Sequence, residues 1–74
     1  MIAQIQAEIA AEYLRSIEIH GHFASPHEAY AVILEELDEF WDELKKKQGD
    51  RKRLHDEMVQ VGAMCLKFLE EFQV

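Results

Sequence analysis

The 74-residue chain contains eight basic and fifteen acidic residues, which give it a formal net charge of −7. So acidic a chain repels a phosphate backbone, which argues against nucleic acid as a direct partner. It contains no apolar run of membrane-spanning length and no charged start followed by an apolar signal segment. We therefore expect one domain over residues 1–74, cytoplasmic, that binds neither nucleic acid nor a membrane.

The chain is short for a self-sufficient hydrophobic core. At this size, apolar burial roughly balances an ordering cost of about 1.5 kcal/mol per residue. Cys65 is the only cysteine, so an internal disulfide cannot compensate, while 49% of the residues are hydrophobic. We therefore expect a homo-oligomer, either a dimer or a tetramer. Cys65 itself falls on an apolar stripe and is predicted to be a small core residue.

Residues 2–20 predict the first helix. Isoleucines and a tyrosine recur on one face, and no glycine or proline interrupts the segment before Gly21, which suits the position just after a helix. Leu14 and Ile19 lie off this face. They indicate a second buried surface, as a subunit interface would require.

A helix-start signal follows the first connection. Ser25 suits the N-cap, Pro26 the first helical position, and Glu28 the third, where its side chain closes a capping box. We expect the second helix to run over residues 26–47, with three lysines at its end facing the negative end of the helix dipole.

A short turn then predicts a third helix over residues 51–72. Gly49 is expected to supply a positive φ and Asp50 the N-cap, and so short a turn returns the chain antiparallel. Gly62 interrupts this helix at a cost of about 1 kcal/mol relative to alanine, which indicates close packing there. The pattern predicts an all-α protomer of three antiparallel helices that assembles into an oligomeric helical bundle.

Residues 35–43, EELDEFWDE, place six carboxylates within nine residues. At about 100° per residue, Glu36 lies beside the apolar arc of this segment and Glu39 one turn further on, so their side chains can converge. Later in the chain, Glu57 lies just off the apolar stripe, with Gln60 further round on the same side. Antiparallel packing of the two segments would bring all four side chains to one pocket.

Carboxylates on facing helices suit a hard metal ion, because Mg²⁺ and Mn²⁺ prefer oxygen ligands. Several acids beside an apolar seam repel one another near neutral pH unless a cation compensates them. Glu43 lies on the same edge and is a further candidate ligand. The alternative is a solvated acidic face, which the spacing alone leaves open. Histidines near the first connection lack the cysteine or acid spacing that completes a zinc site.

Aromatic and basic residues near this acidic edge are candidates for substrate binding. An exposed aromatic ring can stack on a nucleobase, although an aromatic at helical spacing more often belongs to a core or an interface. Basic side chains near the turn can reach a phosphate or simply balance charge at the helix ends. The candidate residues are Trp41, Lys45, Arg51 and Arg53.

Two motifs carry a family resemblance. Residues 35–39 fit EExxE, and residues 57–60 stand where a following helix carries ExxD. Together they resemble the all-α nucleoside triphosphate pyrophosphohydrolases of the MazG-like type. The amino-acid sequence over roughly residues 25–70 is similar to that of small phage- or mobile-element-borne members.

The resemblance implies hydrolysis between the α- and β-phosphates of a nucleoside triphosphate, which releases the monophosphate and pyrophosphate. It also implies Mg²⁺, or Mn²⁺ in its place, and an oligomeric assembly. The motif positions that match metal ligands are Glu36, Glu39 and Glu57. Glu35 matches the first motif acid, which assists or orients the attacking water.

One departure from the family pattern is that Gln60 replaces the ExxD aspartate. An amide oxygen can coordinate Mg²⁺ as a fourth contact but brings no charge. The chain is also shorter than a full four-helix family core. The alternative function is therefore a non-catalytic helical oligomer that binds nucleotide or a protein partner. Net charge alone suggests a third hypothesis, an acidic partner for a basic protein.

Overall fold

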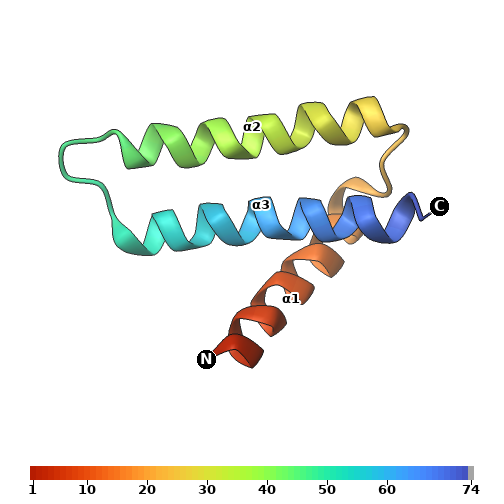
Figure 1. Cartoon of the computed structure of the whole chain (residues 1–74), viewed down its shortest axis with the longest axis horizontal. Coiled ribbons are helices and arrows are strands. Elements are labelled where there is room, and N and C mark those ends of the chain that lie inside the picture. The colour runs from red at the N-terminus through yellow and green to blue at the C-terminus, as the bar shows by residue number, and fades with distance from the viewer. Residues whose placement is uncertain (74) are drawn as a thin grey trace.

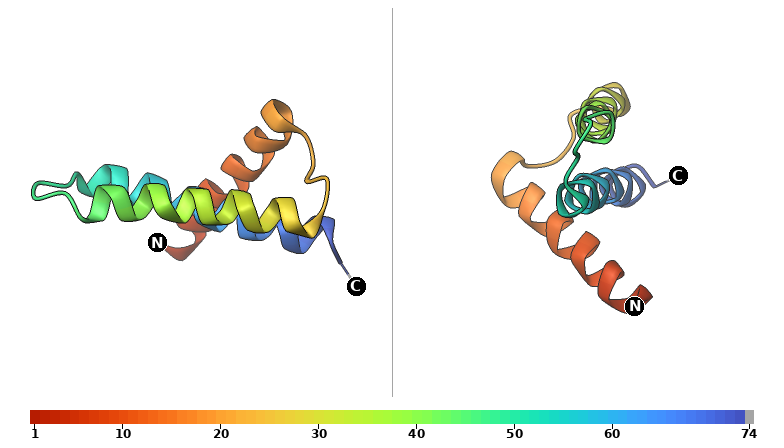
Figure 2. Two further views of the ribbon diagram at one scale, coloured as in Figure 1. Left: turned by 90° about the horizontal axis from the view of Figure 1, so that it is seen from above. Right: turned by 90° about the vertical axis from the view of Figure 1, so that its left-hand side faces the viewer.

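The computed structural model describes residues 1–73, which form three helices and no strand. They are α1 (Ile2–His20), α2 (Pro26–Leu44) and α3 (Arg51–Glu71). α2 and α3 run antiparallel side by side, while α1 crosses α3 obliquely (Figures 1 and 2). α1 and α2 each pack against α3, and over residues 1–73 they do not approach each other closely. The all-α prediction is confirmed, but the expected antiparallel arrangement holds for α2 and α3 and not for α1.

The predicted helix starts are present. The Oγ of Ser25 accepts a hydrogen bond from the backbone N–H of Glu28 at 3.1 Å, and the Glu28 side chain accepts one from the backbone N–H of Ala24 at 2.9 Å. At the start of α3, the Asp50 side chain accepts from the backbone N–H of Lys52 at 2.8 Å. Both caps satisfy backbone donors that a helix leaves unpaired in its first turn.

The second helix ends three residues earlier than predicted, at Leu44 instead of Lys47. The backbone N–H of Lys46 donates to the carbonyl of Glu43, which is a tighter turn than an α-helix makes. The Glu43 side chain also accepts from the backbone N–H of Asp50 at 2.9 Å and so draws the chain back toward α3.

The prediction of a positive φ at Gly49 is wrong. Within residues 1–73 only Gly21 has one, at 72°, where it ends α1 as expected. Gly49 is needed for a different reason, because a Cβ atom there would lie 2.7 Å from the carbonyl oxygen of Glu43. Gly62 is a place of close packing, as predicted, since a Cβ there would lie 3.2 Å from the Cδ1 of Ile9 on α1.

The buried core is small. Its four buried apolar residues are Phe23, Ala29, Ala63 and Met64, and they are surrounded by half-buried side chains from all three helices. Cys65 is exposed, so its predicted place in the core is wrong. Leu14 and Ile19 are exposed in the protomer, so their burial in a subunit interface stays a prediction.

Buried polar contacts fix the connection between α1 and α2 onto α3. Lys67 is only 2% exposed, and its Nζ donates to the Oγ of Ser16 at 3.1 Å and to the carbonyl of Gly21 at 2.7 Å. The Glu71 carboxylate accepts from the backbone N–H of Phe23 at 2.8 Å. These contacts hold the end of α1 and the connection that follows it against α3.

Among residues 1–73, none of the three helices combines the length and the apolar composition that a membrane-spanning helix needs.

Candidate metal centre

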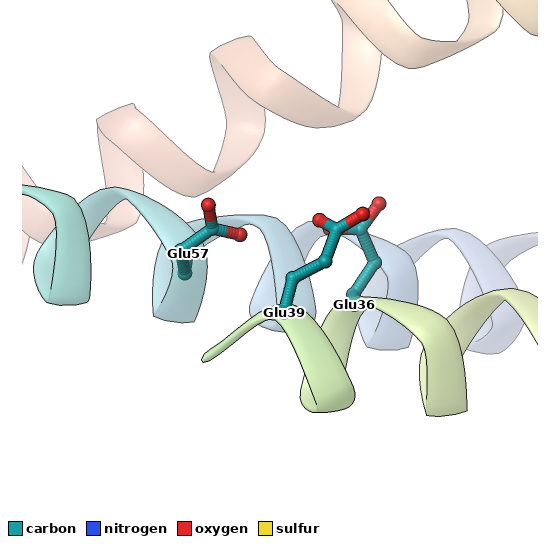
Figure 3. Close-up of side chains that lie close together, drawn as sticks. All are labelled: Glu36, Glu39 and Glu57. Atoms are coloured by element: carbon teal, nitrogen blue, oxygen red, sulfur yellow. The ribbon is translucent and has the colours of Figure 1, made fainter. Parts of the chain in front are cut away.

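Three glutamates of the two antiparallel helices converge on one point. Glu36 and Glu39 project from α2, one helical turn apart, and Glu57 projects from α3. One carboxylate oxygen of each lies within 4.8 Å of those of the other two. Figure 3 shows that all three side chains point toward the side on which α1 crosses. The structure thus brings together the three acids that the helical spacing placed on facing edges.

Two oxygens of this cluster are buried without a hydrogen-bond donor. They are Oε2 of Glu36 and Oε2 of Glu57. A buried acceptor left unpaired costs free energy, so it is rare in folded proteins. The residues present fit a hard divalent cation, because such an ion takes carboxylate oxygens as ligands and would satisfy both buried atoms at once.

The cluster also shifts the acid–base behaviour of its members. Burial raises the pKa of Glu36 from 4.5 to about 7, and the charges of Glu39, Glu57 and Glu35 add to this effect. Burial likewise raises the pKa of Glu57, together with the charge of Glu39, while the guanidinium of Arg53 opposes the rise. Burial and mutual repulsion both disfavour the ionised carboxylates, and a bound proton or cation would offset the repulsion.

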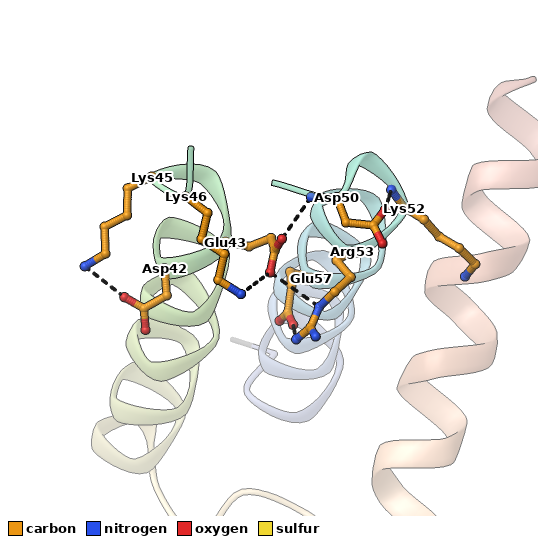
Figure 4. A network of polar contacts seen from close by, with 8 residues as sticks. All are labelled: Asp42, Glu43, Lys45, Lys46, Asp50, Lys52, Arg53 and Glu57. Atoms are coloured by element: carbon orange, nitrogen blue, oxygen red, sulfur yellow. Dashed lines mark hydrogen bonds and ion pairs between the residues drawn. The ribbon is translucent and has the colours of Figure 1, made fainter. Parts of the chain in front are cut away.

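Glu43, the further candidate ligand, is occupied elsewhere. Its side chain is 5% exposed, and its carboxylate accepts from the backbone N–H of Asp50 and from the Nζ of Lys46, with the Nε of Arg53 at 3.4 Å (Figure 4). The hydrogen bond from Asp50 lowers the pKa of Glu43, and those from Lys46 and the nearby Arg53 act in the same direction. Glu43 therefore closes the turn between α2 and α3.

The four candidate substrate-binding residues lie in different surroundings. Arg53 is beside the cluster, with its Nη2 3.9 Å from the Oε1 of Glu57. Lys45 pairs with Asp42 near the turn, at 3.2 Å. Trp41 is 54% exposed on α2, and Arg51 is exposed at the start of α3. Arg53 is thus the candidate that the structure brings to the three glutamates.

A cavity of about 420 Å³ adjoins the cluster. It lies between α1 and α2, over α3, and Glu36 belongs both to its wall and to the carboxylate cluster. Glu35 and Gln60 also line it. The apolar part of the lining consists of Ile19, Phe23, Val32 and Met64.

Sequence reasoning missed this cavity and the buried Lys67 at its edge. The only signal for Lys67 was a charged residue between the apolar residues Met64 and Phe68 in the stripe of α3. The cavity itself depends on the angle at which α1 crosses α3. Periodicity does not report that angle.

In comparisons with protein-family models, with curated proteins and with solved structures, this chain matches none of them. The geometry of the three glutamates and of the adjoining cavity is therefore what supports a function.

Proposed function

We propose that this protein is a divalent-cation-dependent nucleoside triphosphate pyrophosphohydrolase, which releases a nucleoside monophosphate and pyrophosphate. The observation that carries the proposal is the convergence of Glu36, Glu39 and Glu57, two of which have a buried oxygen without a donor. The order and spacing of the motif acids, which resemble those of MazG-like enzymes, support the same reaction.

The three glutamates would hold Mg²⁺, or Mn²⁺ in its place. The bound ion would neutralise phosphate charge and activate the attacking water. Glu35 lies next to the cluster in the wall of the cavity and would orient that water as a hydrogen-bond acceptor. Gln60, in the same wall, would offer an amide oxygen as a neutral fourth contact.

The cavity provides room for the substrate. Its volume of about 420 Å³ falls in the range of small-molecule sites. Phe23, Val32 and Met64 give it an apolar wall suited to a nucleoside, and Glu36 belongs both to the lining of the cavity and to the three-glutamate cluster. Arg53 lies one helical turn before Glu57 on α3, with its Nη2 3.9 Å from the Oε1 of Glu57. Its guanidinium would contact a phosphate oxygen of the substrate.

A second candidate function is a non-catalytic helical oligomer that binds nucleotide or a protein partner. Gln60 favours it, because an amide in place of the motif aspartate leaves the centre one negative charge short. Such a scaffold would still bind a metal–nucleotide complex.

The test is pyrophosphate release from a panel of ribo- and deoxyribonucleoside triphosphates with Mg²⁺, with Mn²⁺ and with a chelator. We expect metal-dependent release from the wild type that is lost in Glu39→Gln. The matched control is Glu18→Gln, because Glu18 is exposed on α1, away from the cluster. Full activity in Glu39→Gln would contradict the ligand assignment. No release from any triphosphate by the folded wild type would favour the non-catalytic oligomer.

A further inference from the structure

The cavity beside the candidate metal centre extends to the buried side chain of Lys67. Glu36 and Gln60 line the end near the three glutamates, and Ser16 and Lys67 line the other end. Lys67 follows Glu57 on α3 by about 15 Å along the helix axis, at a rise of roughly 1.5 Å per residue. A nucleotide whose phosphates lie at the glutamates therefore directs its base toward Lys67.

This far end of the cavity holds a buried cation without a carboxylate partner. Lys67 is 2% exposed, and its Nζ donates to two neutral oxygens, the Oγ of Ser16 and the carbonyl of Gly21. The same Nζ lies 4.5 Å from the centre of the Phe23 ring. The ion pairs formed within residues 1–73 do not include Lys67. Its ammonium group is thus held in a fixed position but is not neutralised.

Two hydrogen-bond donors at this end have no acceptor in the described part of the chain. An ammonium group has three N–H bonds, and the contacts of Lys67 to Ser16 and Gly21 use two of them. The Ser16 hydroxyl is 6% exposed and accepts from Lys67, so its own proton is also left to donate. Buried donors without an acceptor cost free energy. A ligand atom that accepts from both would remove this cost.

The charge of the cavity wall restricts what that ligand atom is. Glu28 and Glu35 lie in the same wall and would repel an anionic group. A neutral oxygen accepts from an ammonium group without this repulsion. On a nucleobase a keto oxygen is such an acceptor, whereas an amino group at the same position is a donor.

We propose that the Lys67 end of the cavity binds a nucleobase that carries a keto oxygen, as in hypoxanthine, guanine, uracil and thymine. It rejects a base with an amino group in that place, as in adenine and cytosine. Lys67 and Ser16 both donate to the keto oxygen, and an amino group would leave both buried donors unpaired. Because the phosphates would lie at the glutamates, this base recognition rests on the proposed function. Lys67 is then a specificity-determining residue.

The test compares two pairs of nucleoside triphosphates that differ at this edge of the base, ITP with ATP and UTP with CTP. We expect kcat/KM of the wild type to be at least about tenfold higher for the keto member of each pair. Lys67→Met keeps an unbranched side chain without a donor and should bring each ratio to within about twofold of one. The matched control is Lys52→Met, exposed on α3, which should keep the wild-type ratios.

Ser16→Ala is a second variant, needed because Lys67 also holds the end of α1 against α3. It removes one donor while the contact of Lys67 to the Gly21 carbonyl remains, and should lower each ratio by at least about threefold. Circular dichroism checks that the variants remain helical. A purely structural role of Lys67 and Ser16 would lower kcat/KM equally for both members of a pair. Wild-type ratios in the folded variants would therefore overturn the proposal.

A binding measurement separates base recognition from hydrolysis. Equilibrium dialysis of inosine and adenosine in chelator requires neither metal nor phosphate, and we expect inosine to bind at least about tenfold more tightly. This preference without pyrophosphate release from any triphosphate would support base recognition and contradict the proposed hydrolysis. Pyrophosphate release with equal kcat/KM within each pair would overturn base recognition and leave the hydrolysis standing. If no triphosphate is hydrolysed and the two nucleosides bind equally or not at all, both proposals fail.

Discussion

In the protein without a bound metal ion, the ionised form of the Glu36 carboxyl group lowers the stability of the fold. Its pKa is raised to about 7 by burial and by the neighbouring acids, so the folded chain holds a proton that the unfolded chain releases above its ordinary pKa of 4.5. The stability that this proton contributes is complete below about pH 4.5 and is lost as the pH rises to about 7. A bound cation would remove the cost in the upper part of this range.

This cost can be measured with Glu36→Gln, whose amide does not ionise. In chelator, urea unfolding should show the stability of the variant rising relative to the wild type between pH 5 and pH 8. After discounting for solvent screening of a half-buried group, the gain should be on the order of 1 kcal/mol. A difference between variant and wild type that stays constant over this range would contradict the shifted pKa.

Glu43 should show the opposite dependence on pH. Its pKa is lowered, first by the hydrogen bond from Asp50 and then by Lys46 and Arg53, so its contribution is present above about pH 4.5 and lost as the pH falls. Glu43→Gln should therefore lower the melting temperature at pH 7 by more than at pH 4. Glu18→Gln, on an exposed part of α1, is the control. An equal decrease at both pH values would mean that the charge of Glu43 is not what closes the turn.

At the scale of the helices, the sequence predicted the starts better than the ends. Ser25 and Asp50 are local signals, because each caps the turn that follows it directly in the chain. The end of α2 depends on Glu43 reaching forward to the N–H of Asp50, a contact that periodicity does not encode. The turn pattern likewise predicts a positive φ at Gly49, but Gly49 does not have one, and its role is to leave room for the carbonyl oxygen of Glu43.

Two alanine substitutions separate these glycine roles. Gly49→Ala should destabilise the fold by about 2 kcal/mol, because its Cβ would meet the rigid carbonyl of Glu43 at 2.7 Å. Gly62→Ala should be nearly neutral, since the side-chain tip of Ile9 at 3.2 Å can move and the helix gains about 1 kcal/mol of propensity. Chemical denaturation of both variants checks this. A larger loss for Gly62→Ala would contradict the assigned roles.

At the scale of the whole molecule, the convergence of Glu36, Glu39 and Glu57 was predictable because it needs only helical periodicity and an antiparallel turn. The cavity was not predictable, because the apolar stripe of α1 shows which residues are buried but not the angle at which α1 crosses α3. The prediction for Cys65 is wrong for a related reason. Its stripe is apolar, but an apolar stripe does not show which of its members a neighbouring helix covers, and Cys65 is exposed.

The most direct test of the metal centre is calorimetric titration of Mn²⁺ into the wild type, Glu39→Gln and Glu18→Gln. We expect the wild type and Glu18→Gln to bind with equal affinity, and the loss of one carboxylate ligand in Glu39→Gln to weaken binding by at least about tenfold. Absence of Mn²⁺ binding by the wild type, or equal binding by Glu39→Gln, would show that the three glutamates do not form a cation site.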